Sequence, residues 1–177
     1  AVQPSVGRAP DIDKALQRLH EDADAPDTGD GPLDEEGAGD CVEHLRDLAR
    51  EAPVIRLVNT LIGRVIELRA SDIHLEPRRD ISKVRFRIDG VLHKVFELPT
   101  PVMTAAVSRI KVLGRMDLAE RRRPQDGRIK TRSPGGREVE MRLSTMPTAF
   151  GEKCVMRIFD PDTAVKSMAQ LGFSESE

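Results

Sequence analysis

Aromatic residues are almost absent from this sequence, which has five Phe, no Trp and no Tyr among 177 residues. Sites that stack single-stranded nucleic acid or carbohydrate on aromatic rings normally need more of them, so both classes are disfavoured. Cys41 and Cys154 stand alone with no CxxC pair, which argues against a disulfide framework and is typical of a reducing cytosol. No uncharged apolar run approaches the ~18–20 residues of a membrane span, and no signal-peptide core opens the chain. These absences predict a soluble, cytoplasmic protein.

The net charge of −2 hides an uneven distribution of charge. Residues 1–40 hold 3 basic and 11 acidic residues, whereas the remainder holds 25 basic and 19 acidic ones. Arginine supplies 21 of the 28 basic residues, and its planar guanidinium suits carboxylate and phosphate groups. The basic part therefore favours anionic contacts that the average charge would not suggest.

Residues 1–40 are predicted to be a linker that precedes one domain over residues 41–163. Residues 10–20 could form a short helix with one apolar stripe, but residues 21–40 are acidic, rich in Gly and Pro, and contain one Leu. Such a segment buries too little apolar surface to offset its ordering entropy, so we predict disorder. A plain spacer is favoured over an acidic site for a partner.

The ordered part alternates helical and strand patterns. Apolar residues in 53–68 fall on one helical stripe after Pro53, at Val54, Leu57, Val58, Leu61, Ile62 and Val65. Strands are predicted in SDIHLEP, KVRFRID and VLHKVFEL, with Asp89-Gly90 as a two-residue hairpin turn. A helix over 100–114 and the strands RIKTR, REVEMRLSTM and EKCVMRIFD follow. This order predicts an α+β domain in which helices pack on an antiparallel sheet.

Motifs for independent catalysis are missing. The sequence contains no GxxxxGK followed by Ser or Thr, so it has no phosphate-binding P-loop and should not hydrolyse a nucleotide by itself. It has no GxSxG nucleophile elbow either, and Cys154 lies in an apolar strand, where a thiol is usually inert. Asp72, His74 and Glu76 share one strand face and could hold a divalent metal, but alternate side chains stand ~7 Å apart. A hydrogen-bonded strand face is therefore favoured, and no metal site is predicted.

Arginine offers the strongest candidate site. Arg142 and Arg157 lie on polar strand faces and are expected on neighbouring strands, where they repel each other unless Glu138, Glu140 or a bound anion compensates. A surface ion-pair ladder and an anion site are both consistent with this pattern. The loop cluster Arg121–Arg123 is more typical of a solvated patch or a partner contact, and Arg128 points toward the same end of the hairpin.

Several long segments resemble a known family. RASDIHLEP, VRFRIDGVLHKV, SRIKVLGRMDLAERRRPQDGRI, REVEMRLSTMPTAFGEKCVMRIFD and the trailing LGF are similar, in order from Pro53 to Phe173, to one domain of the type II secretion and type IV pilus assembly ATPases. That domain is the second N-terminal, PAS-like one. The resemblance implies a cytoplasmic homohexamer, peripheral to the inner membrane through its platform proteins, with ATP and Mg²⁺ bound by a RecA-like motor domain. Residues 164–177 would begin the linker to that absent domain, and the four-cysteine zinc site of many members would lie beyond this chain.

The resemblance also implies roles for four arginines. Arg142 and Arg157 match the residues that reach the γ-phosphate of ATP on the motor domain. Arg128 and Arg123 match basic positions at the interface or near the phosphates of the nucleotide. The chain would then regulate the motor and transmit force, with no catalytic residue of its own. Two rival functions are a free-standing PAS-like ligand sensor and a basic nucleic-acid-binding domain. Few aromatics and 19 interspersed acids disfavour the second.

Overall fold

The computed structural model describes residues 35–132, 136 and 138–159, and side chains from Val42 onward. It contains α2 (Glu35–Arg50), α3 (Ala52–Glu67), β1 (Asp72–Glu76), β2 (Ile81–Ile88), β3 (Val91–Pro99), α4 (Thr100–Leu113), β4 (Gln125–Arg132), β5 (Glu138–Thr148) and β6 (Gly151–Phe159). The predicted helix over residues 10–20 and the predicted linker 164–177 lie outside these residues. From α3 onward, the order of a helix, three strands, a helix and three strands matches the prediction, and α2 precedes it.

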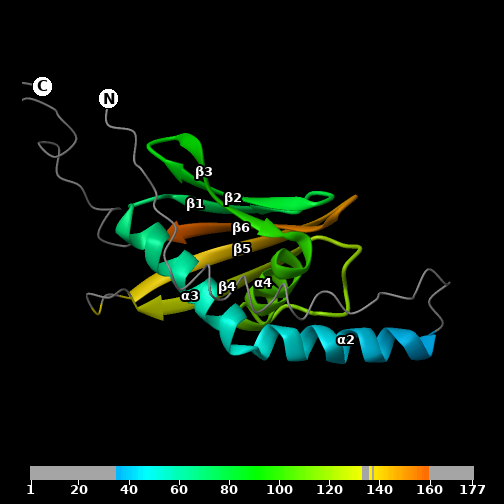
Figure 1. The fold of residues 1–177 in the computed structure, drawn as a ribbon. Helices are drawn as coiled ribbons and strands as arrows, with labels where there is room; N and C mark the ends of the chain where they lie inside the picture. Colours follow the sequence, from blue (N-terminus) through cyan, green and yellow to red (C-terminus); the bar gives the residue numbers. More distant parts are fainter. Residues whose placement is uncertain (1–34, 133–135, 137, 160–177) are drawn as a thin grey trace, which may run out of the picture.

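The helix α2 corrects the predicted linker boundary. It begins at Glu35, so the last six residues of the segment predicted to be disordered are helical. Three of the acidic residues that suggested disorder, Glu35, Glu36 and Asp40, lie within this helix. Farther along, Leu45 and Ala49 are buried, and α2 packs against α4 and α3 as the outermost helix in Figure 1.

The helices α3 and α4 follow the sequence pattern closely. All six residues of the predicted stripe on α3 are buried, and a proline stands in its first turn. A residue at this position needs no hydrogen-bond donor, which is why proline is tolerated there. The helix α4 ends at Leu113, one residue before the predicted end, and the N–H of the capping Gly114 donates to the carbonyl oxygen of Ile110 at 2.8 Å.

The six strands form one antiparallel sheet in the order β3-β2-β1-β6-β5-β4. The first strand therefore lies in the centre beside the last, and each half of the sheet contains a hairpin. At the predicted turn, Asp89 and Gly90 both have positive φ, 49° and 81°, as a type I′ hairpin requires. The strand β4 begins at Gln125, three residues earlier than the predicted strand RIKTR.

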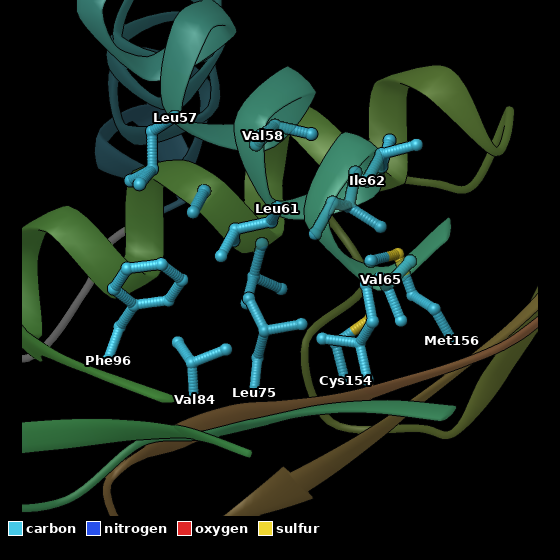
Figure 2. Packing of buried hydrophobic residues seen from close by; sticks show 14 of the residues in the cluster. Leu57, Val58, Leu61, Ile62, Val65, Leu75, Val84, Phe96, Cys154 and Met156 are labelled. Carbon is cyan, nitrogen blue, oxygen red and sulfur yellow. The ribbon is translucent and has the colours of Figure 1, made fainter. Parts of the chain in front are cut away.

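The helices cover one face of the sheet. In Figure 2, Leu57, Leu61 and Val65 of α3 point toward apolar side chains of the sheet, including Val84 and Met156. Residues of α4 complete the same cluster. The α+β prediction is confirmed, with the PAS-like arrangement of an antiparallel sheet and helices on it. Within the described part of the chain, no helix is both long and apolar enough to cross a membrane.

Candidate functional site

The face of the sheet opposite the helices is charged. Strand side chains alternate between faces, so the buried Ile73 and Leu75 of β1 send Asp72, His74 and Glu76 to the other side. The same alternation on β2 places Lys83, Arg85 and Arg87 there, beside β1. We call this surface the charged face.

One line of residues across the charged face holds four arginines. Register pairs join residues on β2, β1, β6, β5 and β4, in that order: Arg87, Asp72, Arg157, Arg142 and Arg128. We call this set the arginine row. Directly opposite side chains have Cβ atoms about 5 Å apart, and like charges in that position destabilise a sheet. The row therefore concentrates positive charge that a counter-charge must balance.

Asp72 provides the only carboxylate in the row, and it is nearly inaccessible. Its Oδ1 accepts a hydrogen bond from Nε of Arg157 at 2.9 Å, and its Oδ2 lies 3.3 Å from Nε of Arg87. The Ser71 hydroxyl donates to Oδ2 at 2.8 Å. Burial alone would raise the pKa of Asp72, but the hydrogen bonds from Arg157 and Ser71, with the charge of Arg157, lower it overall. The same contact raises the pKa of Arg157. The carboxylate is therefore ionised, and its single negative charge balances the positive charge of one of the two neighbouring arginines.

Arg142 is balanced differently. Its guanidinium lies over the ring of Phe159, 4.7 Å from the centroid, in a cation–π contact. Among the described residues no carboxylate lies within 4 Å of it: Glu140 approaches Arg128 at 3.8 Å and Glu138 approaches Arg132 at 3.9 Å. The adjacency of Arg142 and Arg157 is confirmed. Compensation by Glu138 and Glu140, one of the two alternatives, is not seen for this pair, because these carboxylates lie nearest Arg132 and Arg128.

The two remaining arginines of the prediction lie in different places. Arg128 stands opposite Arg142 in the row, with its side chain 70% exposed. Arg123 lies in the loop before β4, where its backbone N–H donates to Oε1 of Glu120 at 3.1 Å. The strand begins at Gln125, about 10 Å from Arg128 at ~3.3 Å per residue. The structure thus brings Arg128 into the row and leaves Arg123 outside it.

Glu76 forms a second buried acidic centre on the charged face. Its carboxylate lies 2.6 Å from Arg85 and 3.3 Å from Lys153. Burial would raise the pKa of Glu76, but the hydrogen bonds from Arg85 and Lys153 lower it. Between the two acids, burial and the charge of Lys153 lower the pKa of His74. Asp72 and Glu76 are thus held by hydrogen bonds and ion pairs, as the favoured interpretation expected, whereas Nδ1 of His74 is buried without a hydrogen-bond partner. Among the described residues no three potential ligands are grouped around a metal position.

A buried ion pair lies on the other side of the sheet. Lys111 of α4, 1% exposed, donates to Oε1 of Glu152 at 2.9 Å and to the Glu120 carbonyl oxygen at 2.8 Å. The pair ties α4 to β6 and to the loop that carries Arg121–Arg123. This pair was not predicted from the sequence, although Lys111 falls four residues after the buried Val107. Asp72 was noted but not as an arginine partner, because the β1–β6 pairing joins residues 85 apart in the chain.

Comparisons with known proteins identify similar sequences. Residues 47–177 match the family described as Type II/IV secretion system protein. The chain is 58% identical over 127 residues to the type IV pilus assembly ATPase TfpB of Acinetobacter baylyi, a match that covers 72% of this chain and 22% of that protein. It is 46% identical over 175 residues to the type II secretion system protein E of Xanthomonas campestris pv. campestris, covering 96% of this chain and 30% of that protein. Among solved structures, the pilus retraction motor PilT with bound ADP gives a TM-score of 0.42 at 21% identity, over 66% of this chain and 32% of that one.

The chain thus spans less than a third of the length of the two curated relatives. The family match covers most of the chain, including α3, α4 and all six strands. The resemblance seen in the sequence is confirmed: the chain belongs to the Type II/IV secretion system protein family.

Proposed function

We propose that this chain is the regulatory and force-transmitting N-terminal domain of a hexameric ATPase that powers type II secretion or type IV pilus assembly. Family membership supports the proposal, as do two relatives named as a pilus assembly ATPase and a type II secretion protein. Because those relatives are more than three times longer than the matched region, the proposal assigns ATP hydrolysis to a RecA-like motor domain outside this chain. ATP and Mg²⁺ would be held mainly there.

The arginine row is the observation that supports a role in nucleotide response. Arg157, Arg142 and Arg128 stand side by side on three adjacent strands, and all three are exposed. In the proposal, Arg157 and Arg142 reach the γ-phosphate of ATP on the motor domain of the same or a neighbouring subunit. The guanidinium groups would neutralise charge on the transferring phosphoryl group, and their contact would depend on whether the γ-phosphate is present. Domain closure would then follow the nucleotide state.

Movement of this domain would be passed to platform proteins of the inner membrane, with the ATPase itself in the cytoplasm. A ligand-sensing function would instead need polar groups inside the core. The clustered core residues are apolar, from Leu57 on α3 to Met156 on β6, and most charged side chains of β1 and β2 lie on the other face of the sheet. The polar strand residues on the inner face are few and include Ser82, Thr145 and Glu152. Of these, Glu152 is paired with Lys111. This distribution supports the charged face as the functional surface.

The test uses the full-length protein and compares Arg142→Ala with Arg132→Ala. Both residues are exposed arginines on the charged face, but Arg132 lies four residues from Arg128 and outside the row. Loss of one preorganised donor to a reacting phosphate should lower ATP turnover on the order of 10²–10³-fold. Arg132→Ala should turn over ATP at nearly the wild-type rate, and neither change should move the melting temperature much. Wild-type turnover by Arg142→Ala would refute the proposed role of the row.

A further inference from the structure

Asp72 occupies the centre of the charged face, on the strand that lies between β2 and β6. We infer that Asp72 is a positioning residue for Arg157, which it holds so that the outer edge of the guanidinium projects toward an anion. The inference rests on the proposed function, because it assigns Asp72 a part in the contact between Arg157 and phosphate. It adds a residue that makes no contact with the nucleotide itself.

The bond to Asp72 uses the inner edge of the guanidinium. Oδ1 accepts from Nε at 2.9 Å, so both Nη groups of Arg157 remain available. No described residue accepts a hydrogen bond from them, and 65% of the Arg157 side chain is exposed. Arginine binds phosphate through two parallel N–H···O bonds, which requires a fixed plane as well as charge. The bond to Asp72 holds the plane of the guanidinium and leaves both Nη groups of Arg157 free to bind phosphate.

The carboxylate is itself held on its other oxygen. Oδ2 accepts from the Ser71 hydroxyl at 2.8 Å and lies 3.3 Å from Nε of Arg87. The backbone of Ser71 is fixed to both flanking strands: its N–H donates to the Arg87 carbonyl oxygen at 2.8 Å, and its carbonyl oxygen accepts from Ile158 at 2.9 Å. The orientation of Asp72 is thus set by β1, β2 and β6 together.

Stability alone does not account for this arrangement. In this pair only the carboxylate is buried, since 65% of the Arg157 side chain is exposed, and ion pairs with a solvent-exposed partner typically contribute little to stability. The neighbouring Arg142 shows that the fold places an arginine in the row without a carboxylate, since it rests on Phe159. The distinct feature of Arg157 is therefore an orientation fixed by hydrogen bonding.

A double-mutant cycle in the full-length protein separates positioning from a structural role. Asp72→Asn removes the charge at almost constant volume, Arg157→Ala removes the arginine, and the third variant carries both changes. We expect Arg157→Ala to lower turnover at saturating ATP on the order of 10²–10³-fold. Asp72→Asn should lower it about 10–100-fold, the cost of misplacing a reacting group. The double variant should match Arg157→Ala within about twofold, because Asp72 then has nothing left to position.

Glu76→Gln is the matched control. It also neutralises a buried carboxylate of β1, but Glu76 contacts Arg85 and Lys153, which lie outside the arginine row. Its turnover should stay within about threefold of the wild-type rate, and its melting temperature should fall about as much as that of Asp72→Asn. If Asp72→Asn fails to fold, Ser71→Ala provides the same test. It removes one bond to the carboxylate and should cost about threefold in turnover only while Arg157 is present.

Wild-type turnover by the folded Asp72→Asn variant would overturn the inference. So would a loss that persists at full size in the Arg157→Ala background, because a merely structural effect adds to the other. In both cases, a lowered ATP turnover of the Arg157→Ala variant would still support the proposed function. Wild-type turnover by Arg157→Ala would instead overturn the phosphate role of Arg157 and the inference together.

Discussion

Replacing Lys111 with methionine should destabilise the fold strongly. The Lys111 side chain is 1% exposed, and its ammonium group donates to the Glu152 carboxylate at 2.9 Å and to the Glu120 carbonyl oxygen at 2.8 Å. Methionine has a similar length and fills a similar volume, so packing against α4 should be largely kept. The substitution therefore isolates the loss of the charge that faces Glu152.

The expected cost follows from the carboxylate left behind. Removing one partner of a buried ion pair typically costs about 3–5 kcal/mol, because the remaining charge stays buried without its counterion. Arg121 lies 3.9 Å from the other carboxylate oxygen of Glu152 and can compensate in part. We therefore expect a loss near the lower end, about 3 kcal/mol. The double variant Lys111→Met, Glu152→Met should recover most of it, since two apolar side chains leave no unpaired charge.

Urea unfolding of the chain gives the measurement. Circular dichroism must serve as the probe, because the sequence has no Trp or Tyr to report by fluorescence. Lys130→Met makes the same chemical change at an exposed position of β4 and should alter the free energy of unfolding by less than about 0.5 kcal/mol. A loss below about 1 kcal/mol for Lys111→Met, or no recovery in the double variant, would contradict the buried pair.

Three further predictions concern two glycines, the reactivity of Cys154 and stability at low pH. Gly127→Ala should destabilise by about 1–3 kcal/mol in urea unfolding, because its Cβ would lie 2.8 Å from a carbonyl oxygen at the end of α4. Gly63→Ala, with nothing within 4 Å, should stabilise by up to about 1 kcal/mol. Burial raises the pKa of Cys154 to about 12, so with the other cysteine changed to serine the folded chain should resist iodoacetamide at pH 8 and react only when urea unfolds it. Asp72 and Glu76 have lowered pKa values in the folded chain. The stability that their ionised forms contribute is therefore fully present above the ordinary carboxyl pKa range and is lost as the pH falls through the lowered pKa values. The double variant Asp72→Asn, Glu76→Gln should show a smaller decline in the free energy of unfolding below about pH 5 than the wild type.

The sequence predicted the elements well because their signals are local. The stripe on α3 recurs at helical spacing, and Asp89-Gly90 supplies the two positive φ angles of the hairpin. The predicted end of the linker at residue 40 was wrong because the composition of a segment gives no information about the contacts that its neighbours make with the rest of the domain. The segment is in fact continuous with a helix that packs through Leu45 against the rest of the domain.

The candidate site was predicted only in part, since it depends on strand register. Arg142 and Arg157 are joined by a short hairpin, so their adjacency could be anticipated. The contact of Arg157 with Asp72 depends on the β1–β6 pairing, and nothing in the local pattern of either strand specifies that partner. Lys111 was missed for a different reason: its spacing indicated an inward position, but a lysine is rarely buried without a partner that only the folded chain reveals.

A structure of the full-length protein with a non-hydrolysable ATP analogue would show whether Arg142 and Arg157 reach the γ-phosphate. The measurement is the distance from the guanidinium nitrogens of Arg142 and Arg157 to the γ-phosphate oxygens. The proposal predicts about 2.7–2.9 Å for at least one nitrogen of each arginine, with Asp72 still bonded to Nε of Arg157. Both arginines facing solvent or protein, more than about 8 Å from a γ-phosphate fully bound by other residues, would contradict it.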